Sequence, residues 1–141
     1  MTEQSALRED GWPLFYILSP TGEPIPAPTD PEFDIAEWMF EHHDEAIVAE
    51  EIVGDACVVT SFTSMDARTR DMGGPPLLWE TTIAGGKHNG GRWCYPSVLE
   101  AERSHDGIVR MLKREREIGR FAARRLSSLK AVHAHDSGGK D

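Results

Sequence analysis

The stretch EAIVAEEIVGDACVVTSFTSM, residues 45–65, carries the strongest β-sheet signal in the chain. Two runs rich in β-branched residues, AIVAEEIV and ACVVTSFTSM, flank the dipeptide Gly54-Asp55. A two-residue loop that begins with glycine is typical of a tight β-hairpin, because its first residue needs a positive φ. The sequence therefore predicts two antiparallel strands joined at Gly54-Asp55.

A third strand of the same sheet is expected over LLWETTIA, residues 77–84, after a loop over 66–76. Prolines precede this run and glycines end it, as strand boundaries require. Alternation places the more apolar side chains on one face: Leu77, Trp79, Thr81 and Ile83. Glu80 falls on the other, mixed face together with Leu78 and Thr82. We interpret it as a solvated or partner-facing carboxylate, and a hydrogen bond to the 66–76 loop is the alternative.

Two segments before the hairpin have recognisable patterns. LFYIL, residues 14–18, reads as a strand, and the proline-rich run after it suits an edge or a loop. Asp30-Pro31 is expected to begin a helix over 31–44, with aspartate as cap and proline in the first turn. One side of that helix is apolar: Ile35, Trp38, Met39 and His42. The opposite side carries the acidic residues Asp34, Glu37, Glu41 and Asp44.

A long helix is expected at the C-terminal end of the chain. The sequence Ser97-Val98-Leu99-Glu100 is a capping box, which marks a helix start. Residues at helical spacing form a stripe that would pack on the sheet: Val98, Ala101, His105, Ile108 and Leu112. The stripe continues less regularly through Ile118, Phe121, Leu126 and Leu129. We expect a helix of ~30 residues with a break near Gly119.

These elements predict an α+β fold: a two-layer sandwich in which an antiparallel meander of three to four strands packs against two helices. The chain of 141 residues suits a single domain. Its compact core is expected over 12–112, and 113–141 would form a basic helical extension.

The net charge is −9, but it is unevenly distributed. Residues 1–66 hold 15 acids and one base, residues 67–102 are balanced, and residues 103–141 hold five acids and ten bases. This uneven distribution of charge indicates electrostatic attraction between the acidic N-terminal part and the basic C-terminal part, either within one chain or between chains. Mimicry of nucleic acid by the acidic half, or phosphate binding by the basic helix, are the alternatives.

Several function classes find little support in the sequence. No apolar run approaches the ~20 residues of a membrane helix, and the N-terminus lacks the features of an export signal, so we expect a cytoplasmic protein without membrane contact. Cys57 and Cys94 are expected as packed thiols. No paired carboxylates or nucleophile motif emerge, and the clusters His42-His43-Asp44 and His133-Ala134-His135-Asp136 lack metal-ligand spacing. We therefore predict no enzyme, no cofactor and no metal.

Two groups of polar residues remain as candidate binding sites. The first surrounds the glycine-rich loop 85–92 and consists of Glu80, Lys87, Arg92 and His105. That loop would accept a nucleotide phosphate, although a connector that needs positive φ is the stronger interpretation. His105 lies on the apolar stripe, which favours a core histidine bonded to a strand or loop. The second group is the basic helix, with Arg110, Arg114, Arg124 and Arg125, for which nucleic-acid binding is unlikely in so acidic a chain.

The run from Val53 to His105 resembles a family of small proteins common in bacteriophages and prophages. The family has a pattern like T-x-F-x-G-x-D-H … PPLLFETMvFGG … RY-x-T-x-x-E-A-x-x-G-H. Matching residues are Thr60, Phe62, Asp66, Pro75, Pro76, Leu77, Leu78, Glu80, Thr81, Gly85, Gly86, Glu100, Ala101 and His105. The resemblance spans roughly 35–110, so it excludes the N-terminal strand and the basic tail.

Three departures from the family pattern bear on function. Ala67 stands where the family has histidine, Trp79 replaces its phenylalanine and Thr82 its methionine. Any chemistry that required that histidine is lost here. The resemblance implies phage association and a fold, and no reaction.

Together these observations give three functional hypotheses. The first is a phage-associated accessory protein that engages or inhibits a host or defence component through its acidic surface. The second is a virion or assembly component that self-associates through the C-terminal helix. The third is a small-ligand binder that uses the 85–92 loop.

Overall fold

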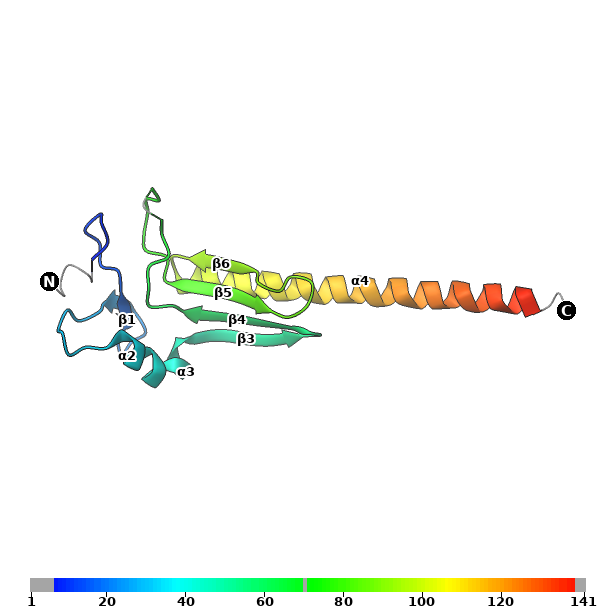
Figure 1. Ribbon diagram of the computed structural model, residues 1–141, viewed down its shortest axis with the longest axis horizontal. Coiled ribbons are helices and arrows are strands. Elements are labelled where there is room, and N and C mark those ends of the chain that lie inside the picture. Colours follow the sequence, from blue (N-terminus) through cyan, green and yellow to red (C-terminus); the bar gives the residue numbers. More distant parts are fainter. Residues whose placement is uncertain (1–6, 70, 139–141) are drawn as a thin grey trace.

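The computed structural model describes residues 7–69 and 71–138, with side chains of the last helix described as far as Leu129. The elements are β1 (Tyr16–Leu18), β2 (Pro24–Pro26), α2 (Ile35–Glu41), α3 (His43–Ala46), β3 (Ile47–Val53), β4 (Ala56–Phe62), β5 (Trp79–Ala84), β6 (Arg92–Tyr95) and α4 (Val98–Gly138). They confirm the α+β class. Strands β3 to β6 form an antiparallel meander, and β1 pairs with β2 in a separate small sheet (Figure 1).

The predicted hairpin is present. Val53 pairs with Ala56 across the two-residue turn, and Gly54 has a φ of 60°. A bulge lies between Ile47 and Ala49, where β3 begins. The connection from β5 to β6 also depends on glycine: Gly85 has a positive φ, and a side chain there would overlap the carbonyl oxygen of Asp55. The loop thus closes against the hairpin turn, which is possible only without a Cβ.

Helix α4 covers one face of the four-stranded sheet. The buried side chains of the strands alternate, as in β4, where Ala56, Val58, Thr60 and Phe62 point toward the helix. At one end of this layer Val53, Val58 and Ile83 pack with Ile108 and Leu112 of α4. At the other end the core consists of Tyr16, Ala46, Phe62, Leu78, Trp79 and Ala101. Leu78, which we expected on the outer face, is buried because β5 begins only at Trp79 and the chain before it is not yet in the alternating register.

The first helix begins later than its sequence predicted. Asp34, not Asp30, is the N-cap of α2, and its carboxylate accepts hydrogen bonds from the backbone N–H groups of Ala36 and Glu37. The carboxylate of Asp30 instead accepts a bond from the N–H of Glu32 in the preceding turn. The helix is also interrupted at His42, after which α3 forms a further turn. Asp30 and Asp34 are both residues that commonly cap helices, and the prediction that the helix begins after Asp30 is wrong.

The apolar side of α2 packs as expected. Trp38 and Met39 are half-buried against the core, and the Trp38 ring meets Phe62 edge-on at 6.3 Å between centroids. His42 stacks on Trp38 at 4.3 Å, and its Nδ1 lies 2.8 Å from the Trp38 carbonyl oxygen. This histidine is thus a packing residue.

Helix α4 is longer and more regular than predicted. It begins after Ser97, whose Oγ accepts a bond from the N–H of Glu100, in agreement with the predicted cap. It then continues for 41 residues, through Gly119, without the expected break. A glycine makes helix formation less favourable by only about 1 kcal/mol relative to alanine, and the strong helix formers on either side offset this. Past the hairpin turn, where Arg116 approaches Gly54, the helix continues alone (Figure 1).

A buried hydrogen-bond network joins the sheet to α4. The hydroxyl of Thr60 lies 2.5 Å from the hydroxyl of Thr81 and 2.8 Å from Nδ1 of His105, and all three residues are at most 3% exposed. This confirms His105 as a core histidine bonded to a strand. The network fixes the position of the helix over β4 and β5.

Replacing His105 with leucine is expected to lower the free energy of unfolding by about 2 kcal/mol, because it removes one of the two partners of the fully buried Thr60 hydroxyl. Chemical denaturation measures this loss. The matched control is His43→Leu, at an exposed histidine, with an expected change within about 0.5 kcal/mol. Equal effects of the two substitutions would contradict the role given to the network.

Gly119→Ala is expected to stabilise the free half of α4 by about 1 kcal/mol, because the position is helical and open around its Cα. Amide hydrogen exchange over residues 113–129 should slow. Ala123→Gly is the reverse control and should accelerate it. Faster exchange in Gly119→Ala would show that the helix is interrupted there in solution.

Candidate functional site

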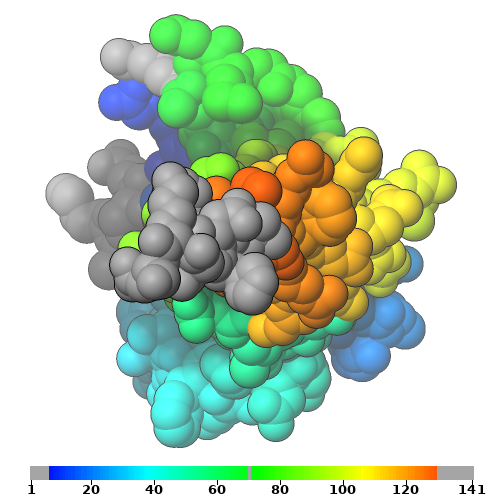
Figure 2. Space-filling view, turned by 90° about the vertical axis from the view of Figure 1, so that its right-hand side faces the viewer, coloured from blue at the N-terminus to red at the C-terminus, as the bar shows by residue number. Residues whose placement is uncertain are grey.

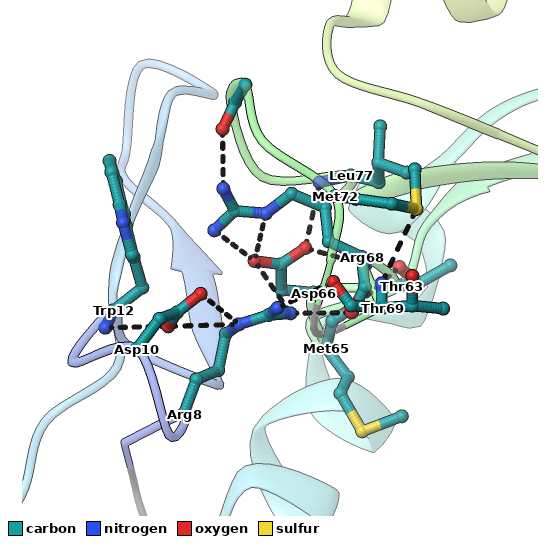
Figure 3. A network of polar contacts seen from close by, with 11 residues as sticks. Arg8, Asp10, Trp12, Thr63, Met65, Asp66, Arg68, Thr69, Met72 and Leu77 are labelled. Carbon is teal, nitrogen blue, oxygen red and sulfur yellow. Dashed lines mark hydrogen bonds and ion pairs between the residues drawn. The ribbon is translucent and has the colours of Figure 1, made fainter.

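The densest cluster of charged side chains is centred on Asp66 (Figure 3). Its carboxylate is buried and accepts bonds from Nε and a terminal nitrogen of Arg68, at 2.9 and 2.7 Å, and from the N–H of Leu77. Arg8 approaches the same carboxylate at 3.5 Å and donates to the carbonyl oxygen of Arg68. The Arg68 guanidinium also lies over the ring of Trp12, 4.9 Å from its centroid.

This cluster ties three segments together. Arg68 donates to the carbonyl oxygen of Gly74, so it closes the 66–77 loop, and Arg8 fastens the N-terminal segment to that loop. Burial alone would raise the pKa of Asp66, but hydrogen bonds from Arg68 and from the backbone outweigh it and hold the pKa below its ordinary value. A carboxylate held ionised and fully paired makes a poor acid or base. We therefore assign the cluster a structural role.

Half of the fourteen residues that carry the phage-family resemblance are buried. Thr60, Thr81 and His105 form the buried network, and Asp66 anchors its loop. Ser64 occupies the position of the pattern's glycine and has a φ of 65°, a left-handed conformation that favours glycine. These buried members of the pattern therefore have structural roles in this chain.

The sheet and loop candidates are divided between opposite faces of the sheet. Glu80 forms an ion pair with Arg92 across neighbouring strands, 2.6 Å between Oε1 and Nε, on the face away from α4. The Glu80 side chain is only 16% exposed, so our expectation of a solvated carboxylate is wrong, and the pair with Arg92 also takes the place of the alternative hydrogen bond to the 66–76 loop. His105 lies on the helix side, so the structure does not bring it together with Glu80.

Lys87 borders a hollow of about 270 Å³ between the hairpin turn, the 85–91 loop and α4. Arg116 lies there too, but so do Asp55 and Glu115, and Glu115 pairs with His88 at 2.9 Å. Two carboxylates beside two bases disfavour a phosphate. The three positive-φ glycines of the loop agree with its interpretation as a connector: Gly85, Gly86 and Gly90.

Neither cysteine has the surroundings of a nucleophile. Both are free, half-buried thiols. Burial raises the pKa of the Cys94 thiol, which lowers its thiolate fraction. Cys57 faces Glu50, with Sγ 3.9 Å from Oε1.

An apolar groove of about 280 Å³ lies between the N-terminal segment and the proline-rich run. Its described lining is Leu7, Pro13, Phe15, Pro26, Ala27, Pro28, Thr29, Asp30, Pro31, Phe33 and Ile35. The one carboxylate, Asp30, already accepts a backbone bond. This lining offers no pair of groups for proton transfer or nucleophilic attack.

The acidic side of α2 and α3 is exposed and carries an unexpected aromatic residue. Phe40 is 85% exposed. Glu37 precedes it by three residues and Glu41 follows it directly on α2, whereas Asp44 lies in α3, beyond the interruption between the two helices; all three acids are exposed. We call these four residues the acidic–aromatic surface. Asp34, predicted with this group, serves as the helix cap. Figure 2 shows the α2–α3 segment, in cyan, as a separate part of the surface that α4 does not cover. Sequence reasoning did not single out Phe40, whose exposure emerges only in the structure.

The free part of α4 exposes apolar side chains among arginines. Ile118, Phe121, Leu126 and Leu129 are each at least 58% exposed. Arg114, Ile118, Phe121 and Arg125 follow one another at spacings of four, three and four residues, so they share one side of the helix. We call these four residues the basic–apolar surface. Arg110 donates to the carbonyl oxygen of Asp106, and Arg124 is exposed beside Arg125.

Within the described residues, no helix is both long enough and apolar enough to cross a membrane. Over the same residues no three His, Cys, Asp or Glu side chains gather in a way that would hold a metal ion. The side chains of His133, His135 and Asp136 lie outside the described part of the structure.

Comparisons of the chain with protein-family models, with curated proteins and with solved structures return no match.

Replacing Asp66 with asparagine is expected to cost about 3 kcal/mol at pH 7, because the buried Arg68 loses its charged partner and Arg8 retains Asp10 but loses Asp66. The pKa of Asp66 is lower in the folded than in the unfolded chain, so its contribution is complete above about pH 4 and is lost as the pH falls through the folded-state pKa. Urea unfolding between pH 7 and pH 3 measures both stabilities.

The difference in the free energy of unfolding between the wild type and Asp66→Asn should become smaller as the pH falls toward 3. Asp44→Asn, at an exposed carboxylate, should show no such difference from the wild type. A stability difference that is independent of pH would contradict the structural role assigned to the ionised Asp66 carboxylate.

Proposed function

We propose that this chain is a phage-associated accessory protein that acts in the host cell by binding proteins and not by catalysis. Its phage association rests on the family resemblance. The proposal is carried by one observation: α4 extends past the sheet as a single helix with an exposed apolar stripe. Exposed apolar residues of this density on an isolated helix are typical of a binding element.

The acidic–aromatic surface is the second binding element. An exposed aromatic ring with several exposed carboxylates nearby has the composition of a binding hot spot, since burying the ring supplies most of the affinity and the charges select the partner. Phe40 at 85% exposure adds nothing to the core. Its position among three carboxylates favours a partner surface that is both basic and apolar.

Two kinds of partner fit these elements. Engagement of a host or defence component through the acidic–aromatic surface is the first hypothesis, and it is supported by Phe40. Assembly through α4 is the second, and it is supported by Ile118 and Phe121, which are 60% and 66% exposed. The nucleotide-binding hypothesis receives no comparable support, because Asp55 and Glu115 border the hollow beside Lys87.

Site-specific photo-crosslinking in infected cells of the native host tests this function. A photoreactive phenylalanine analogue is placed at position 40 or 121, and the control positions are Ile25 and Leu99, which are also exposed and apolar. Defined protein adducts are expected from 40 and 121 and few from the controls. Equal labelling at all four positions would overturn the proposal.

A further inference from the structure

The two binding surfaces have complementary chemistry. The acidic–aromatic surface presents one exposed aromatic ring, Phe40, and three exposed carboxylates close to it in sequence, on α2 and α3. The basic–apolar surface presents two apolar side chains between two arginines. Helices of this kind match when their apolar side chains meet and their charges of opposite sign flank the contact.

The two surfaces cannot meet within one molecule. Figure 1 shows α2 and α3 at one end of the long axis and the free part of α4 directed toward the other end. From Glu117 to Gly138 this free part extends for about 33 Å at the usual rise of 1.5 Å per residue. Any contact between the surfaces therefore joins different molecules.

Pairing of two α4 helices through their basic–apolar surfaces is disfavoured by charge. In an antiparallel pair that places Ile118 against Phe121, Arg114 of each chain faces Arg125 of the other. In a parallel pair each arginine faces its own copy. Both arrangements set like charges opposite each other, which destabilises helix pairs.

We propose that the protein self-associates head to tail, with the basic–apolar surface of α4 in one copy seated on the acidic–aromatic surface of α2 and α3 in the next. This inference rests on the proposed function and names a second copy of the chain as the partner. Because the two surfaces differ, the contact is heterologous, and each added copy leaves one surface of each kind free. The association should therefore grow beyond a dimer and weaken as salt screens the charges.

Two surface variants of the full chain test the contact. The head variant, Phe40→Ser with Glu41→Lys, disables the acidic–aromatic surface. The tail variant, Phe121→Ser with Arg125→Glu, disables the basic–apolar surface. Their controls make the same kinds of change elsewhere: Ile25→Ser with Glu23→Lys for the head, and Leu99→Ser with Arg103→Glu, at the same spacing on α4, for the tail.

Sedimentation velocity over a range of concentrations gives the masses. The wild type and both controls should form a series of oligomers. The head and tail variants should each be monomeric, with association weakened at least about tenfold. An equimolar mixture of head and tail variants should form a one-to-one complex and nothing larger, because it retains one intact surface of each kind. That complex also shows that both variants are folded.

Three outcomes of the sedimentation experiment would overturn the proposal. They are a wild type that stays monomeric, a head variant that still self-associates as well as the wild type, and a mixture that forms no complex. The second outcome would indicate pairing between α4 helices. If crosslinks from positions 40 and 121 reach only other proteins or nucleic acid, the head-to-tail contact is wrong. In that case the adducts to other proteins would still support the proposed function, and adducts to nucleic acid alone would not.

Discussion

The hydrogen bond between Thr60 and His105 is the constraint on which the rest of the structure depends. It lies in the middle of the layer between the sheet and α4, where all its participants are buried, so an error of one residue in the helix position would leave polar groups without partners. The apolar contacts at either side are less demanding, since aliphatic groups tolerate small shifts. This bond fixes the position of α4 on the sheet. The position of α4 in turn sets the direction of its free part and the placement of the basic–apolar surface.

Local signals in the sequence predicted the hairpin at Gly54-Asp55, the start of α4 after Ser97 and the alternation of β5 from Trp79 onward. Each depends on the chemistry of a few neighbouring residues. The predictions were wrong where two nearby residues could play the same role, or where contacts with residues distant in sequence determine which side chains are buried. Asp30 and Asp34 both offer a helix cap, and Leu78 is drawn into the core by contacts far along the chain. The continuity of α4 through Gly119 reflects the summed preference of its flanking residues, which a single glycine did not reverse.

The candidate binding residues were only partly accessible to sequence reasoning. Acidic and basic patches follow from composition, so Glu37, Glu41, Asp44 and the arginines of α4 were identified. Phe40 was not, because one aromatic residue in a helix is ordinarily assumed to face the core, and only the structure shows it outside. Pairings across strands, such as Glu80 with Arg92, depend on a register that no local pattern contains.

Mechanically, α4 is a rod that is held at one end and unsupported at the other. Its base is held against the sheet by the packing of Leu112 near Val53 and by the ion pair between Lys113 and Glu51. The last described contacts along the helix are the pair between Glu115 and His88, 2.9 Å between Oε2 and Nε2, and the approach of Arg116 to Gly54. A sideways force on the tip acts on these contacts through a long moment arm, whereas the hydrogen bonds within the helix run along the axis and resist bending. Under load the molecule would therefore yield first where the hairpin turn meets the helix, and the helix itself would stay intact.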